Sequence, residues 1–209
     1  TDESGLAEMM IGRSVVLRVS KETASPDAKV LQVKNLYVKD DRELLAVNDL
    51  SLEVRSGEIF GIAGVEGNGQ RELVETITGL RTIDTGEILI EETSITKFSP
   101  RQISELGVAH IPEDREKHGL IGPHSVADNL ILNRYYKPPF SIHGIRQQKA
   151  IANYAKEMVE KFDIRTPSIE TPSSSLSGGN KQKAIAAREF NTLCLPGTLI
   201  FILPRFFCL

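Results

Sequence analysis

Residues 64–71, with the sequence GVEGNGQR, have the glycine spacing of a loop that binds phosphate through its backbone. Gly64 and Gly69 are separated as in the pattern G-x-x-x-x-G-K-[ST], and Gly67 adds a third flexible position. Such glycines let the chain turn tightly and point several N–H groups at an anion, at the start of the following helix. The spacing therefore predicts a nucleotide phosphate site made by Gly64, Val65, Glu66, Gly67, Asn68, Gly69, Gln70 and Arg71.

Two positions of this loop depart from the pattern. Gln70 stands where a lysine would contact the β- and γ-phosphates, and Arg71 stands where a hydroxyl would bind Mg²⁺. Loss of a charge-assisted contact of this kind costs on the order of 1.5–3 kcal/mol, and an arginine also repels a divalent cation. The loop alone leaves two interpretations open. It is either a weakened phosphate site or a glycine-rich turn in a flavodoxin-like or dinucleotide-binding fold.

A second motif, LSGGN at residues 176–180, precedes the helical sequence KQKAIAAREF. The hydroxyl of Ser177 and the backbone N–H groups of Gly178 and Gly179 would lie at the positive end of that helix, which suits a terminal phosphate. The motif follows the glycine loop by roughly a hundred residues, with helix-rich sequence between them. This pairing favours the phosphate-binding interpretation of the first loop.

Together the two motifs resemble the ATP-binding domains of ABC transporters, and the resemblance extends through residues 30–191. The segments GEIFGIAGVEGNGQREL, SPRQISELGVAHIPEDREKHGL and LSGGNKQK are most similar to the second ATP-binding domain of the tandem ATPase subunits of bacterial sugar and nucleoside importers. The resemblance implies an α/β P-loop NTPase core with an N-terminal antiparallel β subdomain and a helical insertion. Residues 1–29 would then be a linker from a preceding domain, and residues 192–209 a divergent tail.

The resemblance also implies roles for individual residues. The signature motif, which completes the ATP site of a partner domain, would consist of Leu176, Ser177, Gly178, Gly179 and Asn180. Glu113 would occupy the position of a glutamine that senses the γ-phosphate, and a carboxylate there cannot donate a hydrogen bond while it is ionised. Tyr37 is the nearest aromatic residue to the place where a ring would stack on adenine, and local packing within its strand is an equal alternative.

After residue 191 the resemblance breaks. The family continues with a strand that ends in a metal-binding aspartate, a catalytic glutamate and a later histidine, and NTLCLPGTLIFILPRFFCL matches none of them. We therefore expect a domain that is incomplete at its C-terminal end, exposes apolar faces, and has neither a catalytic residue nor a metal ligand. Its own ATPase activity is expected to be absent.

The implied ligand is ATP, with Mg²⁺ bound weakly or not at all. The implied partners are a second nucleotide-binding domain, transmembrane permease subunits and, indirectly, a substrate-binding lipoprotein, at the cytoplasmic face of the plasma membrane. Two alternatives remain: a non-catalytic docking module for the membrane subunits, and an inert truncated fragment.

Composition limits these possibilities. The chain of 209 residues has a formal net charge of −3, which gives no electrostatic case for nucleic acid. Cys194 and Cys208 have no metal or redox spacing, and the four histidines have no metal-ligand spacing. The apolar run at 199–203 is far too short to span a bilayer and predicts a buried strand.

Strands and helices are expected to alternate around these motifs. The apolar patterns predict a hairpin, a central strand apolar on both faces, and a later helix-rich stretch. The strands are expected at 30–38, 46–54, 58–64, 85–92, 107–111 and 198–203, and the helices at 70–79, 99–106, 125–133, 144–162 and 181–190, with an exposed loop at 166–180.

Overall fold

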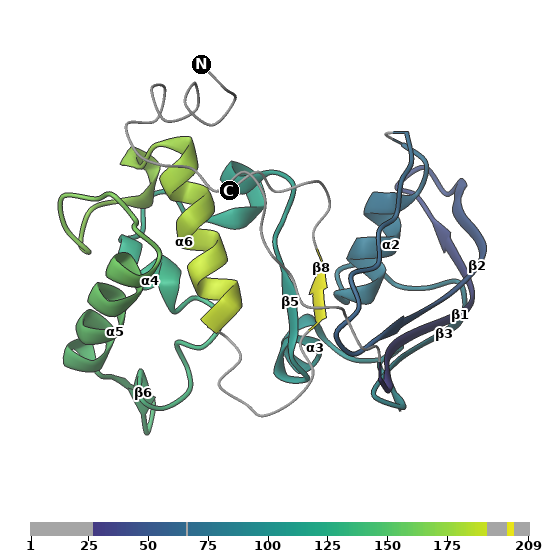
Figure 1. The fold of residues 1–209 in the computed structure, drawn as a ribbon, viewed down its shortest axis with the longest axis horizontal. Helices are drawn as coiled ribbons and strands as arrows, with labels where there is room; N and C mark the ends of the chain where they lie inside the picture. The colour runs from purple at the N-terminus through teal and green to yellow at the C-terminus, as the bar shows by residue number, and fades with distance from the viewer. Residues whose placement is uncertain (1–26, 66, 192–199, 203–209) are drawn as a thin grey trace, which may run out of the picture.

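The computed structural model describes residues 27–65 and 67–191, and the backbone of residues 200–202 (Figure 1). The predictions for most of the linker at 1–29, for Glu66, and for nearly all of the tail at 192–209 lie outside the described residues. The described part forms a lobe built on a β-sheet and a lobe built from helices, with strand β5 between them (Figure 1).

The sheet lobe confirms the predicted antiparallel hairpin. Strands β1 (Lys29–Lys39) and β2 (Leu45–Arg55) pair antiparallel, and β3 (Thr85–Ile90) and β4 (Thr93–Ser94) extend the sheet in the order β2-β1-β3-β4. Apolar residues alternate along β1, so one face of the sheet is buried. Helix α2 (Gln70–Ile77) covers this face by contributing Leu73 and Ile77 to the core.

Helix ends in this lobe follow the capping signals in the sequence. Helix α2 stops before Gly79, which has φ 75° and so takes the left-handed conformation that glycine permits. Helix α3 (Pro100–Glu105) begins with a capping box between Ser99 and Gln102, and it leads into strand β5 (Val108–His110). Strand β8 (Ile200–Ile202) pairs parallel with β5, which confirms a strand within the run predicted at 198–203.

The helical lobe packs α4 (Val126–Leu130), α5 (Gln148–Lys161) and α6 (Gly178–Asn191) around a separate apolar core. The buried Asn129 carboxamide joins α4 to two other segments, because its oxygen accepts the N–H of Ile121 at 2.8 Å and its nitrogen donates to Ser173 Oγ at 3.2 Å. Short elements complete this lobe: a π-helical turn η1 (Arg115–Gly119), a 3₁₀ turn η2 (Ser173–Ser175), and the hairpin of β6 (Ser141–Ile142) and β7 (Ile145–Arg146).

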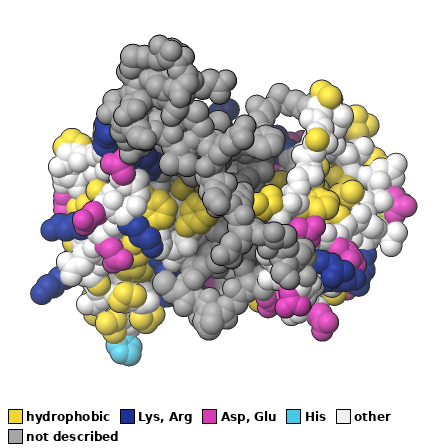
Figure 2. All heavy atoms as spheres, viewed as in Figure 1, with side chains coloured by type: hydrophobic (Ala, Val, Ile, Leu, Met, Phe, Trp, Pro, Cys, Tyr) yellow, Lys and Arg dark blue, Asp and Glu magenta, His cyan; other side chains and the backbone are white. Residues whose placement is uncertain are grey.

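The predicted strand at 58–64 is wrong. Among the described residues no strand pairs with this segment, and Ile59 and Phe60 are 85% and 45% exposed. Apolar surface of this kind was expected, and Figure 2 shows hydrophobic side chains on the surface of both lobes. A strand needs a hydrogen-bonded neighbour, so an apolar run alone does not form one.

Three helix boundaries also differ from the prediction. The helix expected at 144–162 begins at Gln148, because Ile145–Arg146 form strand β7. Helix α6 begins at Gly178 rather than at Lys181, because Ser177 caps it, so the predicted loop at 166–180 ends earlier. The helix expected at 125–133 is confined to Val126–Leu130 and is followed by turns. Among the described residues, no helix is long and apolar enough to cross a membrane.

Candidate functional site

The glycine loop turns sharply between β2 and α2. Gly67 and Gly69 have φ values of 90° and 86°, a region that residues with a Cβ rarely adopt. A Cβ at Gly69 would run into the carbonyl oxygen of Ala46 on β2, whereas one at Gly67 would meet nothing within 4 Å. The loop therefore packs closely against β2 at Gly69 but has free space beside Gly67. It leads directly into the first turn of α2, whose N–H groups have no acceptor within the helix.

Gln70 fills part of this loop. A Cβ added to Gly64 would overlap the side-chain amide nitrogen of Gln70, and the amide carbon would be 2.9 Å from it. The space beside Gly64 therefore holds a neutral carboxamide, which can donate a hydrogen bond but carries no charge. That this carboxamide weakens phosphate binding stays a prediction.

Arg71 points along the helix surface to Glu75. Its Nε donates to Glu75 Oε1 at 2.7 Å, and this hydrogen bond raises the pKa of the guanidinium. Glu75 also pairs with Arg81 at 2.8 Å, and Arg81 in turn pairs with Asp41 at 2.7 Å and donates to the carbonyl of Lys39 at 3.0 Å. The network ties α2 to the turn between β1 and β2, a link that the sequence analysis did not predict.

The donor set at the loop does not suit Mg²⁺. Magnesium prefers oxygen ligands, and the position that would supply a hydroxyl holds the cation Arg71. Among the described residues, no group of three or more His, Cys, Asp or Glu side chains is arranged to hold a metal ion.

The LSGGN motif forms the start of α6. Ser177 Oγ accepts a hydrogen bond from the side-chain amide of Asn180 at 3.0 Å, and the Ser177 carbonyl accepts the N–H of Lys181 at 2.9 Å. Gly179 is exposed, Gly178 is half-buried and Leu176 is anchored in the helical core. The N–H groups of the first turn are thus presented at the surface, as an anion site at a helix start requires.

The segment that carries Glu113 reaches the same helix. Glu113 is exposed just after β5, and Asp114 caps η1 by accepting the N–H groups of Lys117 and Glu116, which lowers the pKa of its carboxyl group. A Cβ at Gly178 would be 3.0 Å from a guanidinium nitrogen of Arg115. Glu113 and the LSGGN motif therefore belong to contacting segments. The sequence analysis missed Arg115, because a single helical turn such as η1 is too short to give a periodic signal.

A second contact between these segments is the ion pair of Glu116 and Lys181. The distance between Nζ of Lys181 and Oε1 of Glu116 is 2.7 Å, and this pair lowers the pKa of Glu116. Further along α6, the carbonyl of Gly119 accepts a hydrogen bond from Arg188 at 2.8 Å. Contacts at both ends of η1 therefore hold this turn against α6.

Tyr37 lies on β1 between the buried residues Leu36 and Val38, so its side chain points to the opposite face of the strand. Its carbonyl accepts the N–H of Asp84 at 3.0 Å. An adenine-stacking role for Tyr37 stays a prediction.

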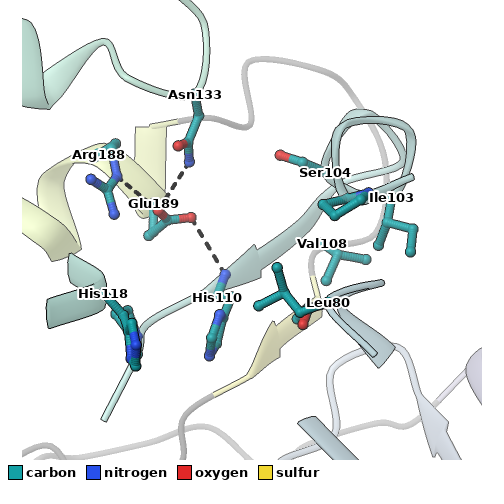
Figure 3. Close-up of a pocket in the computed structure, with 12 residues that line it drawn as sticks. Leu80, Ile103, Ser104, Val108, His110, His118, Asn133, Arg188 and Glu189 are labelled. Atoms are coloured by element: carbon teal, nitrogen blue, oxygen red, sulfur yellow. Dashed lines mark hydrogen bonds and ion pairs between the residues drawn. The ribbon is translucent and has the colours of Figure 1, made fainter. Parts of the chain in front are cut away.

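A cavity of about 200 Å³ lies between the two lobes, beside β5 (Figure 3). Glu189 lines this cavity and accepts hydrogen bonds from Asn133 at 2.9 Å, Arg188 at 2.9 Å and the backbone N–H of His110 at 3.4 Å. Every buried polar side-chain atom of the described residues has a partner, so these groups are structurally satisfied. The sequence analysis did not identify this cluster.

The loop before α2 and the LSGGN motif of α6 lie in different lobes (Figure 1). The structure does not bring the predicted phosphate-binding residues into one site. It places the two motifs apart, each at a helix start.

Comparison with known proteins gives a consistent assignment. The family model described as ABC transporter matches residues 47–193. The guanosine import ATP-binding protein NupO of Bacillus subtilis is 44% identical over 191 residues, covering 91% of this chain and 38% of that protein. The nucleoside import ATP-binding protein NupA of Lactococcus lactis is 48% identical over 186 residues, covering 89% and 37%. The chain therefore spans rather more than a third of the length of these relatives.

Solved structures agree in fold. A nucleotide-free ATP-binding cassette from an ABC transporter superposes with a TM-score of 0.63 at 20% identity, covering 79% of this chain and 66% of that chain. A dimeric ATP-binding cassette in a post-hydrolysis state with ADP and Pi also gives a TM-score of 0.63, at 18% identity, covering 78% and 69%. At these identities the likeness concerns the fold.

Proposed function

The chain belongs to the ABC transporter family, and from this premise we propose that it is an ATP-binding domain of an importer for nucleosides or sugars. It has the ABC ATPase fold, with an antiparallel β subdomain and helices. The class of solute is proposed from relatives whose names specify guanosine, nucleoside and ribose import, at 44%, 48% and 37% identity. Within the importer, the chain would form the second of two ATP-binding domains in one subunit.

The observation that supports this proposal is the separation of the glycine loop from the LSGGN motif, each at a helix start. The loop precedes α2 in the sheet lobe, and the motif begins α6 in the helical lobe. Two domains arranged head to tail would place the loop of each opposite the LSGGN motif of the other. Ser177 and Gly179 would then contact the terminal phosphate of the ATP held by the partner domain.

The chain's own loop is proposed to contribute little to catalysis. Phosphoryl transfer to water depends on positioning and on stabilising charge at the transferred group, and Gln70 and Arg71 replace the residues that would do so. We expect the isolated chain to hydrolyse ATP at no more than the background rate. Turnover above the blank that depends on Mg²⁺ and disappears in Gly69→Asp would contradict this. The same replacements favour, as a second candidate, a non-catalytic module that docks on the membrane subunits.

The proposed partners are the other ATP-binding domain of the subunit and the transmembrane permeases, with a substrate-binding lipoprotein acting indirectly. The proposed location is the cytoplasmic face of the plasma membrane, where the domain would bind peripherally. Pull-down of the permeases with the tandem subunit would test these contacts.

A tandem subunit whose second domain contains residues 30–191 provides the decisive test. Ser177→Arg should abolish ATP-driven uptake, because a bulky cation would block closure onto the partner's ATP and move the helix start away from its phosphate. Gln70→Ala should cost much less, since that loop lacks a lysine and a metal-binding hydroxyl already. Equal loss of uptake in the two variants would contradict the one-competent-site arrangement, and a harmless Ser177→Arg would overturn the role of the LSGGN motif.

A further inference from the structure

Arg71 is the only basic residue between Gly64 and the end of α2, a stretch that also contains Glu66, Glu72 and Glu75. It is the second residue of the helix that follows the glycine loop. Any direct positive charge for a phosphate in this stretch must therefore come from Arg71.

The ion pair that holds Arg71 is local and lies at the helix surface. The side chain of Arg71 is 63% exposed, and that of its partner Glu75, one helical turn away, is 20% exposed. Surface pairs one helical turn apart change an equilibrium by about fivefold at most. A guanidinium that binds phosphate gains charge-assisted hydrogen bonds, commonly in a forked geometry, and these are worth about tenfold or more.

The negative charge of the Glu75 carboxylate is balanced by a second cation besides Arg71. Arg81 pairs with Glu75 Oε2 at 2.8 Å and is only 16% exposed, because Asp41 and the carbonyl of Lys39 also hold it. When Arg71 leaves, Glu75 keeps a fixed cation beside it. The exchange therefore leaves no isolated charge.

Building on the proposed function, we propose that Arg71 exchanges Glu75 for the phosphates of a nucleoside triphosphate, so that a guanidinium replaces both the lysine and Mg²⁺ at this loop. Glu75 then acts as the competing anion that sets the affinity. The donor set, which does not suit Mg²⁺, is consistent with this exchange. The ligand class is a polyphosphate bound without a metal ion.

Calorimetry of the 209-residue chain with ATP and with inorganic tripolyphosphate, both in EDTA, tests the proposal. Arg71→Ala should weaken binding of both ligands about tenfold or more, and Arg71→Lys should recover part of the loss. Glu75→Gln should tighten binding about two- to fivefold. The double variant should bind like Arg71→Ala, because in the proposed exchange Glu75 affects the ligand only by competing for Arg71. Arg42→Ala, which removes an exposed pair with Asp40 in the β1–β2 turn, is the matched control and should bind like the parent.

Three results would overturn the proposal: unchanged binding in Arg71→Ala, equal tightening by Glu75→Gln with and without Arg71, or binding that requires Mg²⁺. A parent chain that binds neither ligand would overturn it as well. The proposed function is judged separately by the uptake assay of Ser177→Arg, which does not involve this loop. If Glu75→Gln fails to fold, the comparison of the parent with Arg71→Ala and Arg71→Lys still decides.

Discussion

The guanidinium of Arg115 lies against the backbone of Gly178, so that a methyl group added at Gly178 would be 3.0 Å from Nη2 and 3.3 Å from Cζ of Arg115. This contact joins the segment after β5 to the first residue of α6. Movement of either segment would therefore shift the other.

Gly178→Ala should leave the free energy of unfolding within about 1 kcal/mol of the parent value, because the crowding atoms are the far end of a flexible side chain. Gly179→Ala is the matched control, since a Cβ there meets nothing within 4 Å. Urea unfolding measures both. A loss of several kcal/mol in Gly178→Ala alone would mean that Arg115 is held rigidly.

Gly69→Ala should destabilise the chain more than Gly67→Ala does. Both glycines have positive φ, so each variant should lose about 1 kcal/mol or more from backbone strain. Only the methyl group at position 69 also collides with the carbonyl of Ala46. The urea concentration at the unfolding midpoint should therefore be highest for the parent, lower for Gly67→Ala and lowest for Gly69→Ala. A lower midpoint for Gly67→Ala than for Gly69→Ala would refute the close approach of the loop to β2.

Glu189→Ala should lower the free energy of unfolding by about 3–5 kcal/mol, because it removes the buried carboxylate that pairs with the buried Arg188. Arg188 and Glu189 are 5% and 4% exposed. Glu157→Ala, on an exposed position of α5, should change the free energy by less than about 0.5 kcal/mol. A loss in Glu189→Ala no greater than in this control would show that the pair is dispensable.

Stability should fall as the pH is lowered below 6.5 because of His110. Burial lowers the pKa of this imidazole from its ordinary value of 6.5. The unfolded chain therefore binds more protons than the folded chain below pH 6.5, and the stability present above that pH is lost as the pH falls towards the folded pKa. His110→Gln should flatten this part of the urea-midpoint profile.

His143→Gln is the control for this titration, since His143 is exposed in the turn between β6 and β7. Its profile should keep the slope of the parent. If His110→Gln keeps that slope too, another group is responsible for the pH dependence.

Local features of the fold could be read from the sequence because their causes are local. The glycines of the loop, the capping of α3 by Ser99, the end of α2 at Gly79 and the alternation in β1 each depend on residues a few positions apart. The same holds for the LSGGN motif, whose serine caps the helix that it begins.

Contacts between distant segments were decided only by the tertiary structure. The segment at 58–64 has the composition of a buried strand, but no strand pairs with it among the described residues. Its apolar pattern therefore predicted a strand that the structure does not contain there. Arg71 pairs with Glu75, which Arg81 also holds, and the sequence analysis did not predict this link. His110 and Glu189 are 79 positions apart and meet because β5 and α6 enclose one cavity. No periodic pattern encodes such a meeting, since it depends on how whole elements pack against one another.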